Sequence, residues 1–434
     1  MSAVINFSSL RKLLEPTCIT REDREDSIPL ISPSNCANKR MNKILAGDFT
    51  VLAESPDPDT VYSGSPCLAQ LPSGRLIASF EWFRPQPLVE EIPDQLEILV
   101  SDDDGSRWRK TTVLDIIWPS LFAVDDALYC IGNRRLSREI VIARSEDGGE
   151  SWSGPSQLFG GRHHNAPTSV LFRDGQVYRA FETCPIGDDA VGRSQWESLV
   201  VAGDLERDLL DPAAWRMSNS VGFPGVPDVL SQRRYQASAT DKVVEDCFIE
   251  GNVIDVRGEM RVLLRTIIDG HTTGGMAAVC SLEDDGNTLD YRFVQFYPMP
   301  GAQCKFHVVY DEESDLFWTT VCLPTDTWQE REPLRKVGFA SPPGNERRIL
   351  MLMYSLDALN WFQAGCVAMS SSIFEAFSYA SQLIQDDDLL VISRTSQGGY
   401  NQHDTNLVTL HRIEKFRALA LDLKPSYSRG SPKS

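Results

Sequence analysis

The feature that most constrains the fold of this chain is an eight-residue motif that occurs twice, each time directly after an apolar run. "SDDDGSRW" (residues 101–108) follows "LEILV", and "SEDGGESW" (145–152) follows "EIVIA". Aspartate and serine side chains can bond backbone groups inside a tight turn, and glycine accepts backbone angles that other residues avoid. The motif therefore predicts a hairpin turn. The two copies are 145 − 101 = 44 residues apart, about the length of one four-stranded propeller blade.

A second repeated unit, an apolar strand followed by a polar turn and another apolar strand, occurs six times. Each turn carries Gly, Asp or Ser, which suit tight hairpins. The six units begin at Ser65, Pro119, Ala166, Glu250, Lys305 and Phe377. A weaker copy of the eight-residue motif, "SLDALNWF", begins at Ser355, and "SLEDDGNTL" from Ser281 is a decayed one.

Short strands between turns, with few amphipathic helices, predict an all-β protein, and six hairpins favour a six-bladed β-propeller. The third and fourth hairpins begin 250 − 166 = 84 residues apart, which leaves room for a seventh blade or an inserted loop. We expect an N-terminal arm over residues 1–46, the propeller over 47–418 and a disordered tail over 419–434.

The charge and composition exclude several function classes. The net charge is −19, from 42 basic and 61 acidic residues, which argues against nucleic-acid and anionic membrane partners. The ten cysteines are scattered and show no metal-ligand spacing. No signal peptide or apolar membrane span is visible. We therefore expect a cytoplasmic protein without a metal or cofactor, whose oligomeric state the sequence leaves open.

The innermost strand of every propeller blade starts near the central axis, so the residues at the six starts converge on one mouth. This position alone yields a set rich in titratable groups, as a catalytic pocket requires. The set comprises Gly64, Ser65, Trp118, Arg162, His163, His164, Asn165, Glu250, Asn252, Lys305, His307, Ser378 and Tyr379.

The motif S-x-D-x-G-x-x-W is the Asp box, and the chain resembles the sialidase superfamily of β-propellers. The resemblance covers roughly residues 50–410 at the level of the repeats, and Asp boxes also occur in non-enzymatic propellers. It implies a glycosidase with Tyr379, in "FSYASQL", as nucleophile, Glu250 as its base and Arg265 as a carboxylate clamp. A near-neutral phenol activated by a carboxylate can attack an anomeric carbon beside a carboxylate without charge repulsion.

The resemblance also shows departures. The family's R-I-P triplet is replaced by Gly64, Ser65 and Pro66, so one of three carboxylate-binding arginines is missing. The family's acidic aspartate has three candidates, Glu90, Glu91 and Asp94, which spacing does not separate. Arg84 matches an arginine that is often found after the "FEW" strand.

The segment "GGRHHNAP" lies outside the family pattern. Histidine titrates near neutral pH and can act as acid or base. His164 with Tyr379 and an arginine clamp therefore favours an alternative, β-elimination from a uronate glycan by a lyase or related exo-enzyme. A third alternative is a non-catalytic glycan- or protein-binding propeller.

We predict an exo-acting, sialidase-like hydrolase that removes a terminal, acidic sugar. The predicted catalytic residues are Tyr379, Glu250, His164, His163 and Asp94. The predicted substrate-binding residues are Arg265, Arg84, Arg162, Arg394, His307 and Trp118.

Overall fold

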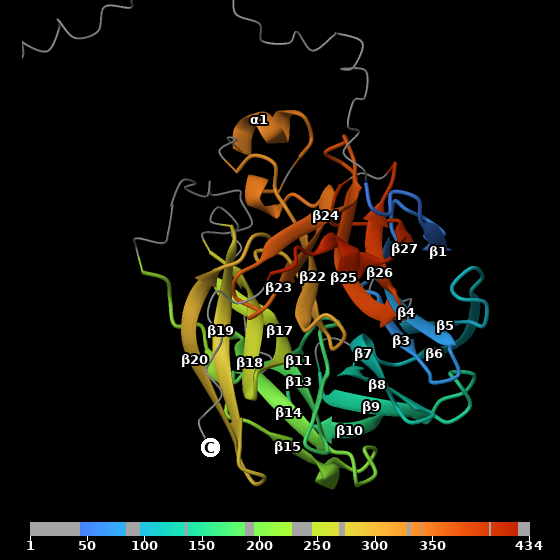
Figure 1. Cartoon of the computed structure of the whole chain (residues 1–434), viewed down its shortest axis with the longest axis vertical. Coiled ribbons are helices and arrows are strands. Elements are labelled where there is room, and N and C mark those ends of the chain that lie inside the picture. Colours follow the sequence, from blue (N-terminus) through green and yellow to red (C-terminus); the bar gives the residue numbers. More distant parts are fainter. Residues whose placement is uncertain are drawn as a thin grey trace, which may run out of the picture. The chain divides into compact units, whose positions relative to one another are not determined.

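The computed structural model describes residues 44–83, 96–134, 138–186, 195–227, 245–268, 274–327, 331–339, 341–398 and 401–423. The chain divides into two compact units, Met1–Lys43 and Ile44–Ser434. The first unit lies wholly outside the described residues, as does most of the predicted tail. The described strands of the second unit form six sheets arranged as the blades of a β-propeller, the fold that the sequence predicts (Figure 1).

Blades 1 to 3 follow one another along the chain, and neighbouring strands in each are antiparallel. Blade 1 contains β2 (Tyr62–Ser63), β3 (Cys67–Gln70), β4 (Leu76–Phe83), β5 (Leu96–Ser101) and β6 (Arg109–Leu114). Blade 2 contains β7 (Ile117–Val124), β8 (Ala127–Asn133), β9 (Ile140–Ser145) and β10 (Ser156–Phe159). Blade 3 contains β11 (His163–His164), β12 (Leu171–Arg173), β13 (Gln176–Thr183), β14 (Glu197–Asp204), β15 (Trp215–Met217) and β16 (Val221–Gly222).

Blades 4 to 6 complete the ring. Blade 4 contains β17 (Cys247–Val256), β18 (Glu259–Ile267), β19 (Met276–Asp284) and β20 (Leu289–Pro298). Blade 5 contains β21 (His307–Asp311), β22 (Leu316–Cys322), β23 (Ile349–Ser355) and β24 (Phe362–Met369). Blade 6 contains β25 (Ala376–Gln385), β26 (Asp388–Ser396), β27 (Leu407–Ile413) and β1 (Thr50–Glu54).

In every blade the pairing of the innermost strand with the second strand position contains one of the six predicted hairpins, which are thereby confirmed. In blades 1 and 3 two short strands share the innermost position, because β2 and β3 both pair with β4, and β11 and β12 both pair with β13. The described part of the long interval after the third hairpin holds the outer strands of blade 3, and the sheets of the described residues number six, not seven. Helices are short: α1 (Arg331–Lys336) and the 3-10 turns η6 (Pro212–Ala214), η9 (Pro343–Asn345) and η10 (Phe416–Leu419). None of the described helices could span a membrane.

The core contains seven apolar clusters, and the six large ones each fill one interface between two adjacent blades. The small seventh cluster, of Cys247, Ile249 and Ile267, lies within blade 4. Successive side chains of a strand point to opposite faces of its sheet. In β26, Leu389 and Val391 therefore pack toward blade 5, whereas Leu390 and Ile392 pack toward blade 1. Both faces of the middle strands are buried, which is why their sequences are nearly continuous apolar runs.

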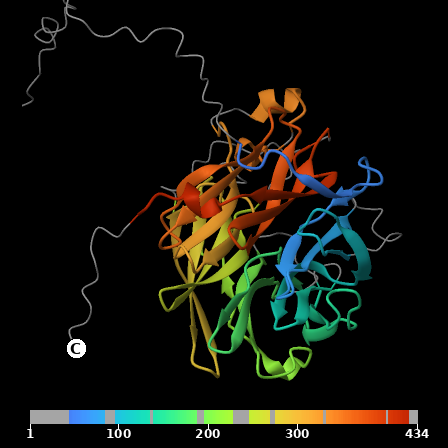
Figure 2. The same cartoon turned by 45° about the vertical axis from the view of Figure 1, so that its right-hand side comes forward.

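The ring is closed by pairing between the two ends of the propeller sequence. β1 pairs with β27 in antiparallel register, with Thr50 opposite Leu410 and Glu54 opposite Leu407. The blue β1 lies against the red strands of blade 6 in Figures 1 and 2. This pairing covers the outer edge of β27. Blade 6 therefore has four strands, of which β25, β26 and β27 come from the C-terminal part of the propeller and β1 from its N-terminal part.

Both copies of the eight-residue motif form the predicted turn between the third and fourth strands of a blade. In the first copy, Ser101 Oγ accepts the N–H of Gly105 at 2.9 Å, and Trp108 donates to the Gly105 carbonyl at 3.0 Å. In the second copy, Ser145 Oγ accepts the N–H of Gly149, also at 2.9 Å. Both glycines have positive φ angles, 79° and 89°, which a Cβ would disfavour.

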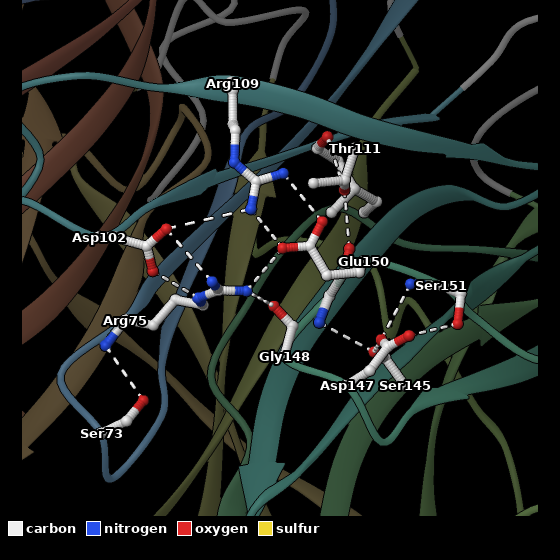
Figure 3. A network of polar contacts seen from close by, with 12 residues as sticks. Ser73, Arg75, Asp102, Arg109, Thr111, Ser145, Asp147, Gly148, Glu150 and Ser151 are labelled. Atoms are coloured by element: carbon white, nitrogen blue, oxygen red, sulfur yellow. Dashed lines mark hydrogen bonds and ion pairs between the residues drawn. The ribbon is translucent and has the colours of Figure 1, made fainter.

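A charged network joins the two turns across the interface between blades 1 and 2 (Figure 3). Arg75 contacts Asp102 at 2.6 Å and Glu150 at 2.9 Å, and Arg109 pairs with the same Glu150. Hydrogen bonds from Arg109 and Arg75 lower the pKa of Glu150 to about 2. The turns thus tie neighbouring blades together at their outer strands.

Polar residues join the blades at the axis as well. In five blades the innermost strand carries one at the same register, as the first residue of its regular pairing with the second strand, after the bulge where there is one, and in each it bonds the backbone of a neighbouring blade. These residues are Cys67, Ser120, Asn252, His307 and Ser381. Asn252 joins three blades, because its Oδ1 accepts the N–H of Ser169 at 3.2 Å and that of Val308 at 3.0 Å.

We predict that Asn252→Ala destabilises the propeller, because two buried amides in different blades lose their acceptor. An unsatisfied buried amide costs about 1–3 kcal/mol. Denaturant-induced unfolding of both proteins measures the difference, with Asn287→Ala in the exposed β19–β20 turn as the control. Equal midpoints for Asn252→Ala and the control would contradict the role assigned to this side chain.

Candidate functional site

Three innermost strands carry the same irregularity near their N-terminal ends. In blades 2, 4 and 6 one extra residue interrupts the pairing with the second strand. The bulge places Trp118, Glu250 and Tyr379 in the left-handed region, with φ angles of 51°, 60° and 52°. For bulky residues this conformation costs about 1–3 kcal/mol and persists only where the surroundings enforce it. All three residues belong to the set predicted to line the mouth.

The second strands place buried polar side chains next to these bulges. Arg265 lies opposite Ile249, the residue before Glu250, and Arg394 lies opposite Ser378, the residue before Tyr379. The two arginines are 1% and 4% exposed. The same position in two blades therefore delivers two guanidinium groups to one end of the innermost strands.

Tyr379, Glu250 and Arg265 meet in one cluster. Arg265 Nη1 lies 3.0 Å from Glu250 Oε2 and 3.4 Å from the Tyr379 hydroxyl, and its Nε donates to the Gln303 carbonyl at 2.9 Å. The Arg394 guanidinium carbon lies 4.6 Å from the centroid of the Tyr379 ring. Glu250 is buried, whereas the Tyr379 ring is half-buried. The structure thus brings together four of the predicted site residues.

Arg347 is a third arginine in this cluster, and our sequence reasoning missed it. Its guanidinium carbon lies 5.1 Å from the Tyr379 ring centroid, and Asn345 Oδ1 holds its Nε and Nη2 at 3.3 and 3.1 Å. Its Nη1 is buried without a hydrogen-bond partner among the described residues. Arg347 precedes the third strand of blade 5, whereas the search covered only innermost and second strands. The doublet "ERR" directly before a strand was the available signal.

The three arginines control the charge state of the tyrosine. Burial and the Glu250 carboxylate would each raise the pKa of the Tyr379 phenol. The positive charges of Arg265, Arg347 and Arg394 outweigh both and hold this pKa below its ordinary value of 10.0. A phenol with a lowered pKa is more easily converted to the nucleophilic phenolate.

Glu81 explains why the first family arginine has no equivalent at position 64. The Gly64 N–H donates to the Glu81 carbonyl at 2.6 Å, and the Ser65 N–H donates to Glu81 Oε1 at 2.8 Å. A Cβ added at Gly64 would clash with the Glu81 side chain. The start of blade 1 therefore has no space for a long side chain at this residue.

His164 lies next to the tyrosine cluster and is linked to it through Glu182. His164 Nδ1 contacts Glu182 Oε2 at 2.9 Å, and Glu182 Oε1 accepts the N–H of Glu250 at 2.6 Å. Burial raises the pKa of the Glu182 carboxyl, and its bonds with His164 and the Glu250 amide oppose that rise. Nδ1 is thus occupied, which leaves Nε2 of the half-buried ring to face a ligand.

Aromatic rings flank this histidine on two sides. The Trp118 ring centroid lies 4.7 Å from that of His164, and the Trp196 centroid lies 5.6 Å from it. The Arg162 guanidinium carbon lies 5.4 Å from the Trp196 centroid. Trp118, Arg162 and His164 therefore share one side of the site, and Trp196 is a neighbour that was not predicted.

Two predicted residues do not reach this cluster. His163 is buried, and its Nε2 contacts the Gly160 carbonyl at 3.0 Å. Consecutive residues of a strand point to opposite sides, so His163 and His164 diverge. His307 Nδ1 accepts the N–H of Gln382 at 3.1 Å, and the residue lines a hollow of about 830 Å³. That hollow is lined by residues such as Val253, Val308 and Leu383, and no residue of the Tyr379 cluster lines it.

The remaining predicted residues, Arg84 and Asp94, lie outside the described residues, as do Glu90 and Glu91. Over the described ranges, no group of three His, Cys, Asp or Glu side chains could hold a metal ion. The eight cysteines in these ranges form no disulfide with one another, and seven of them are buried.

Comparison with solved structures places the fold among known propellers. A Hadza microbial sialidase matches with a TM-score of 0.55 and 14% identity, over 84% of this chain and 68% of that one. Trypanosoma rangeli sialidase in complex with sialic acid matches with a TM-score of 0.55 and 13% identity, over 86% and 60%. An α-L-arabinanase from Penicillium chrysogenum complexed with arabinobiose gives 0.50 and 13%, over 85% and 99%.

No protein-family model matches the chain, and no curated protein matches it. At 12–14% identity the structural matches carry the fold alone. The chain is therefore a six-bladed β-propeller of the sialidase-like type.

Lys305 gives the site a pH-dependent stability term that can be measured. Burial lowers its pKa to about 7, from an ordinary 10.5. Between these values the unfolded chain binds a proton that the folded chain does not, so this residue makes stability rise with pH. We predict that Lys305→Met removes this rise. Unfolding free energies of both proteins from pH 7 to 10 test it, and parallel pH curves would contradict it.

Proposed function

We propose that the protein is a sialidase-like, exo-acting glycoside hydrolase that removes a terminal, acidic sugar from a glycan. The observation that carries this proposal is the packing of three arginines around Tyr379, with Glu250 bonded to one of them. The cluster combines a nucleophile, its base and an anion-binding group at one end of the propeller axis. The Asp-box turns agree with this assignment.

The charges in the cluster favour an anionic sugar over a neutral one. Arg265 is paired with Glu250. Arg347 bonds an amide oxygen, and Arg394 bonds the His403 carbonyl at 2.6 Å and Thr405 Oγ1 at 3.4 Å. Neither of these two guanidinium groups contacts a carboxylate among the described residues. A sugar carboxylate would neutralise them with charge-assisted bonds, and Arg347 Nη1 has an open donor for it.

Arg394 takes over part of the role of the missing family arginine. The family's first arginine enters from the start of blade 1, which Gly64 and Glu81 block here. Arg394 enters from the second strand of blade 6 instead and stacks on both Tyr379 and Phe83. In this proposal the clamp is again threefold, composed of Arg265, Arg347 and Arg394.

The reaction follows from the shared contacts of Arg265. Glu250 and the Tyr379 hydroxyl bind the same Nη1. In this proposal the carboxylate takes the phenol proton as the tyrosine attacks the anomeric carbon. The glycosidic oxygen leaves with a proton from a general acid, for which Glu90, Glu91 and Asp94 remain the predicted candidates. Water then hydrolyses the glycosyl-tyrosine, and the proton returns to the phenolate.

The solved structures with this fold give two substrate classes to compare. The Trypanosoma rangeli sialidase structure contains sialic acid, and the Penicillium chrysogenum arabinanase structure contains arabinobiose. The guanidinium groups of Arg347 and Arg394, which contact no carboxylate among the described residues, support the first class for this chain. A panel of aryl glycosides of acidic and neutral sugars distinguishes the classes.

We predict that Tyr379→Phe abolishes release of the terminal sugar while the thermal melting temperature stays within a few degrees, because only one hydroxyl of a half-buried side chain is lost. Release of the aryl group measures turnover, and calorimetry measures melting. Turnover equal to that of the wild type would end the assignment of Tyr379 as the nucleophile.

We predict that Arg347→Met raises KM for an acidic aryl glycoside roughly 10- to 100-fold, the loss expected for one charge-assisted bond. The neighbouring Arg348→Met is a matched control, since Arg348 pairs with Glu346 and does not contact Tyr379. A KM that changes equally in the two variants would argue against a carboxylate clamp.

One observation favours a second candidate function, elimination from a uronate glycan. His164 is oriented by a buried carboxylate at Nδ1, which is the arrangement of a general base. A base at Nε2 would remove the proton beside the carboxylate, the glycosidic C–O bond at the next carbon would break with its oxygen as the leaving group, and a conjugated double bond would form. An ultraviolet-absorbing product that is lost in His164→Gln would support elimination, whereas release of a saturated sugar supports hydrolysis.

A further inference from the structure

We propose that three buried charged residues, Arg179, Glu182 and Lys305, are positioning residues that hold the three axial bulges in their left-handed conformation. Each crosses from one blade to the backbone of a bulge in a neighbouring blade. The inference rests on the proposed function, in which Tyr379 and Glu250 act on the substrate, but its geometry can also be tested without turnover.

Lys305 holds the bulge that carries Tyr379. It lies two residues before β21 of blade 5, and its Nζ donates to the Ala380 carbonyl of blade 6 at 2.7 Å and to Ser381 Oγ at 3.1 Å. Tyr379 and Ala380 are the residues between the paired positions 378 and 381. The contact therefore fixes the Ala380–Ser381 peptide, which ends the bulge one residue after the tyrosine, and with it the direction of the phenol toward Arg265.

Glu182 holds the bulge that carries Glu250. Its Oε1, from the second strand of blade 3, accepts the N–H of Glu250 in blade 4 at 2.6 Å. Glu182 is fully buried, and its other oxygen contacts His164. One carboxylate thus fixes both the base of the tyrosine and the orientation of the histidine.

Arg179 holds the bulge that carries Trp118. Arg179 lies three residues before Glu182 on the same strand. Its Nη2 donates to the Trp118 carbonyl of blade 2 at 3.0 Å, and its Nε donates to Ser120 Oγ at 2.9 Å. Arg179 is 1% exposed. All three bulges therefore have the same kind of support from a neighbouring blade.

The choice of residue at each bulge matches the backbone group that it must bond. The bulge carbonyls of Trp118 and Ala380 receive nitrogen donors from Arg179 and Lys305, and the Glu250 N–H receives a carboxylate acceptor from Glu182. Charge-assisted bonds are shorter and stronger than neutral ones. Burying a charge is unfavourable unless it is well bonded, so three buried charges at three equivalent bulges point to a shared task at the site.

The first experiment compares Lys305→Met with Arg417→Met. Arg417 bonds the buried Asp311 at 2.8 Å and contacts none of the bulges, so its loss reports general destabilisation. We expect Lys305→Met to lower kcat about 10- to 100-fold with KM nearly unchanged, as for a misplaced nucleophile. We expect Arg417→Met to change neither. Equal kcat in Lys305→Met and wild type would overturn the proposal.

A second readout needs no substrate. The phenolate absorbance of Tyr379 can be titrated as the difference between each protein and its Tyr379→Phe counterpart. Lys305 has a pKa of about 7 and is neutral where phenols titrate, so its removal changes geometry there rather than charge. We expect Lys305→Met to shift this titration toward that of an ordinary tyrosine. An unshifted titration would overturn the proposal that Lys305 positions Tyr379.

If Lys305→Met does not fold, the pair Glu182→Gln and Glu182→Met decides the same question at the Glu250 bulge. Glutamine keeps an acceptor for the Glu250 N–H, whereas methionine has none, and neither carries a charge. We expect Gln to retain kcat within a few fold and Met to lose it about 10- to 100-fold. Equal losses would overturn the proposal. A wild-type protein without glycosidase activity would refute the proposed function. The Tyr379 titration would then still decide whether Lys305 positions Tyr379.

Discussion

The structure depends on the burial of both faces of every sheet between two neighbouring blades. An apolar face that is covered by only one neighbour would remain exposed at the ends of an open row, and pairing of β1 with β27 removes that exposure by closing the ring. The six interface clusters, rather than one central core, hold the described strands together. The axis is consequently the place where polar side chains can gather without interrupting apolar packing.

Gathering charges at the axis has an energetic cost that the inter-blade bonds offset. Arg265 and Glu250 neutralise one another, and Lys305 and Glu182 find backbone partners in the next blade. The bulges turn Glu250 and Tyr379 of strongly paired strands toward Arg265, and the neighbouring blades support the bulges. The apolar packing, the hydrogen bonding of buried polar groups and the proposed chemistry thus each depend on adjacent blades and not on any single blade.

The fold could be predicted from the sequence because its signals are local. Turn residues and alternating apolar runs lie within each hairpin, so the six hairpins and both motif turns are confirmed. The convergence of Tyr379, Glu250, Arg265 and Arg394 could be anticipated as well, since it follows from equivalent positions in repeated blades. The chemical roles of these residues remain predictions.

The rest of the site could not be predicted because its determinants are not periodic. Arg347 enters from a loop before a third strand, where the repeat gives no register. His163 and His164 look equivalent in sequence, but strand alternation sends only His164 toward Tyr379's neighbours. His307 shares the innermost strand with predicted site residues yet serves as a bond between blades 5 and 6, because its register matches Asn252 and Ser381 rather than Glu250.

The sheet shared by β1 and β27 has a consequence for the timing of activity during biosynthesis. Tyr379 and Arg394 belong to the blade of the propeller that is synthesised last, and that blade gains its fourth strand only when it pairs with β1, which is synthesised before the other five blades. A partly synthesised chain therefore holds Glu250 and Arg265 without their tyrosine. The proposed chemistry therefore requires blade 6, which is complete only when β1 has paired with β27.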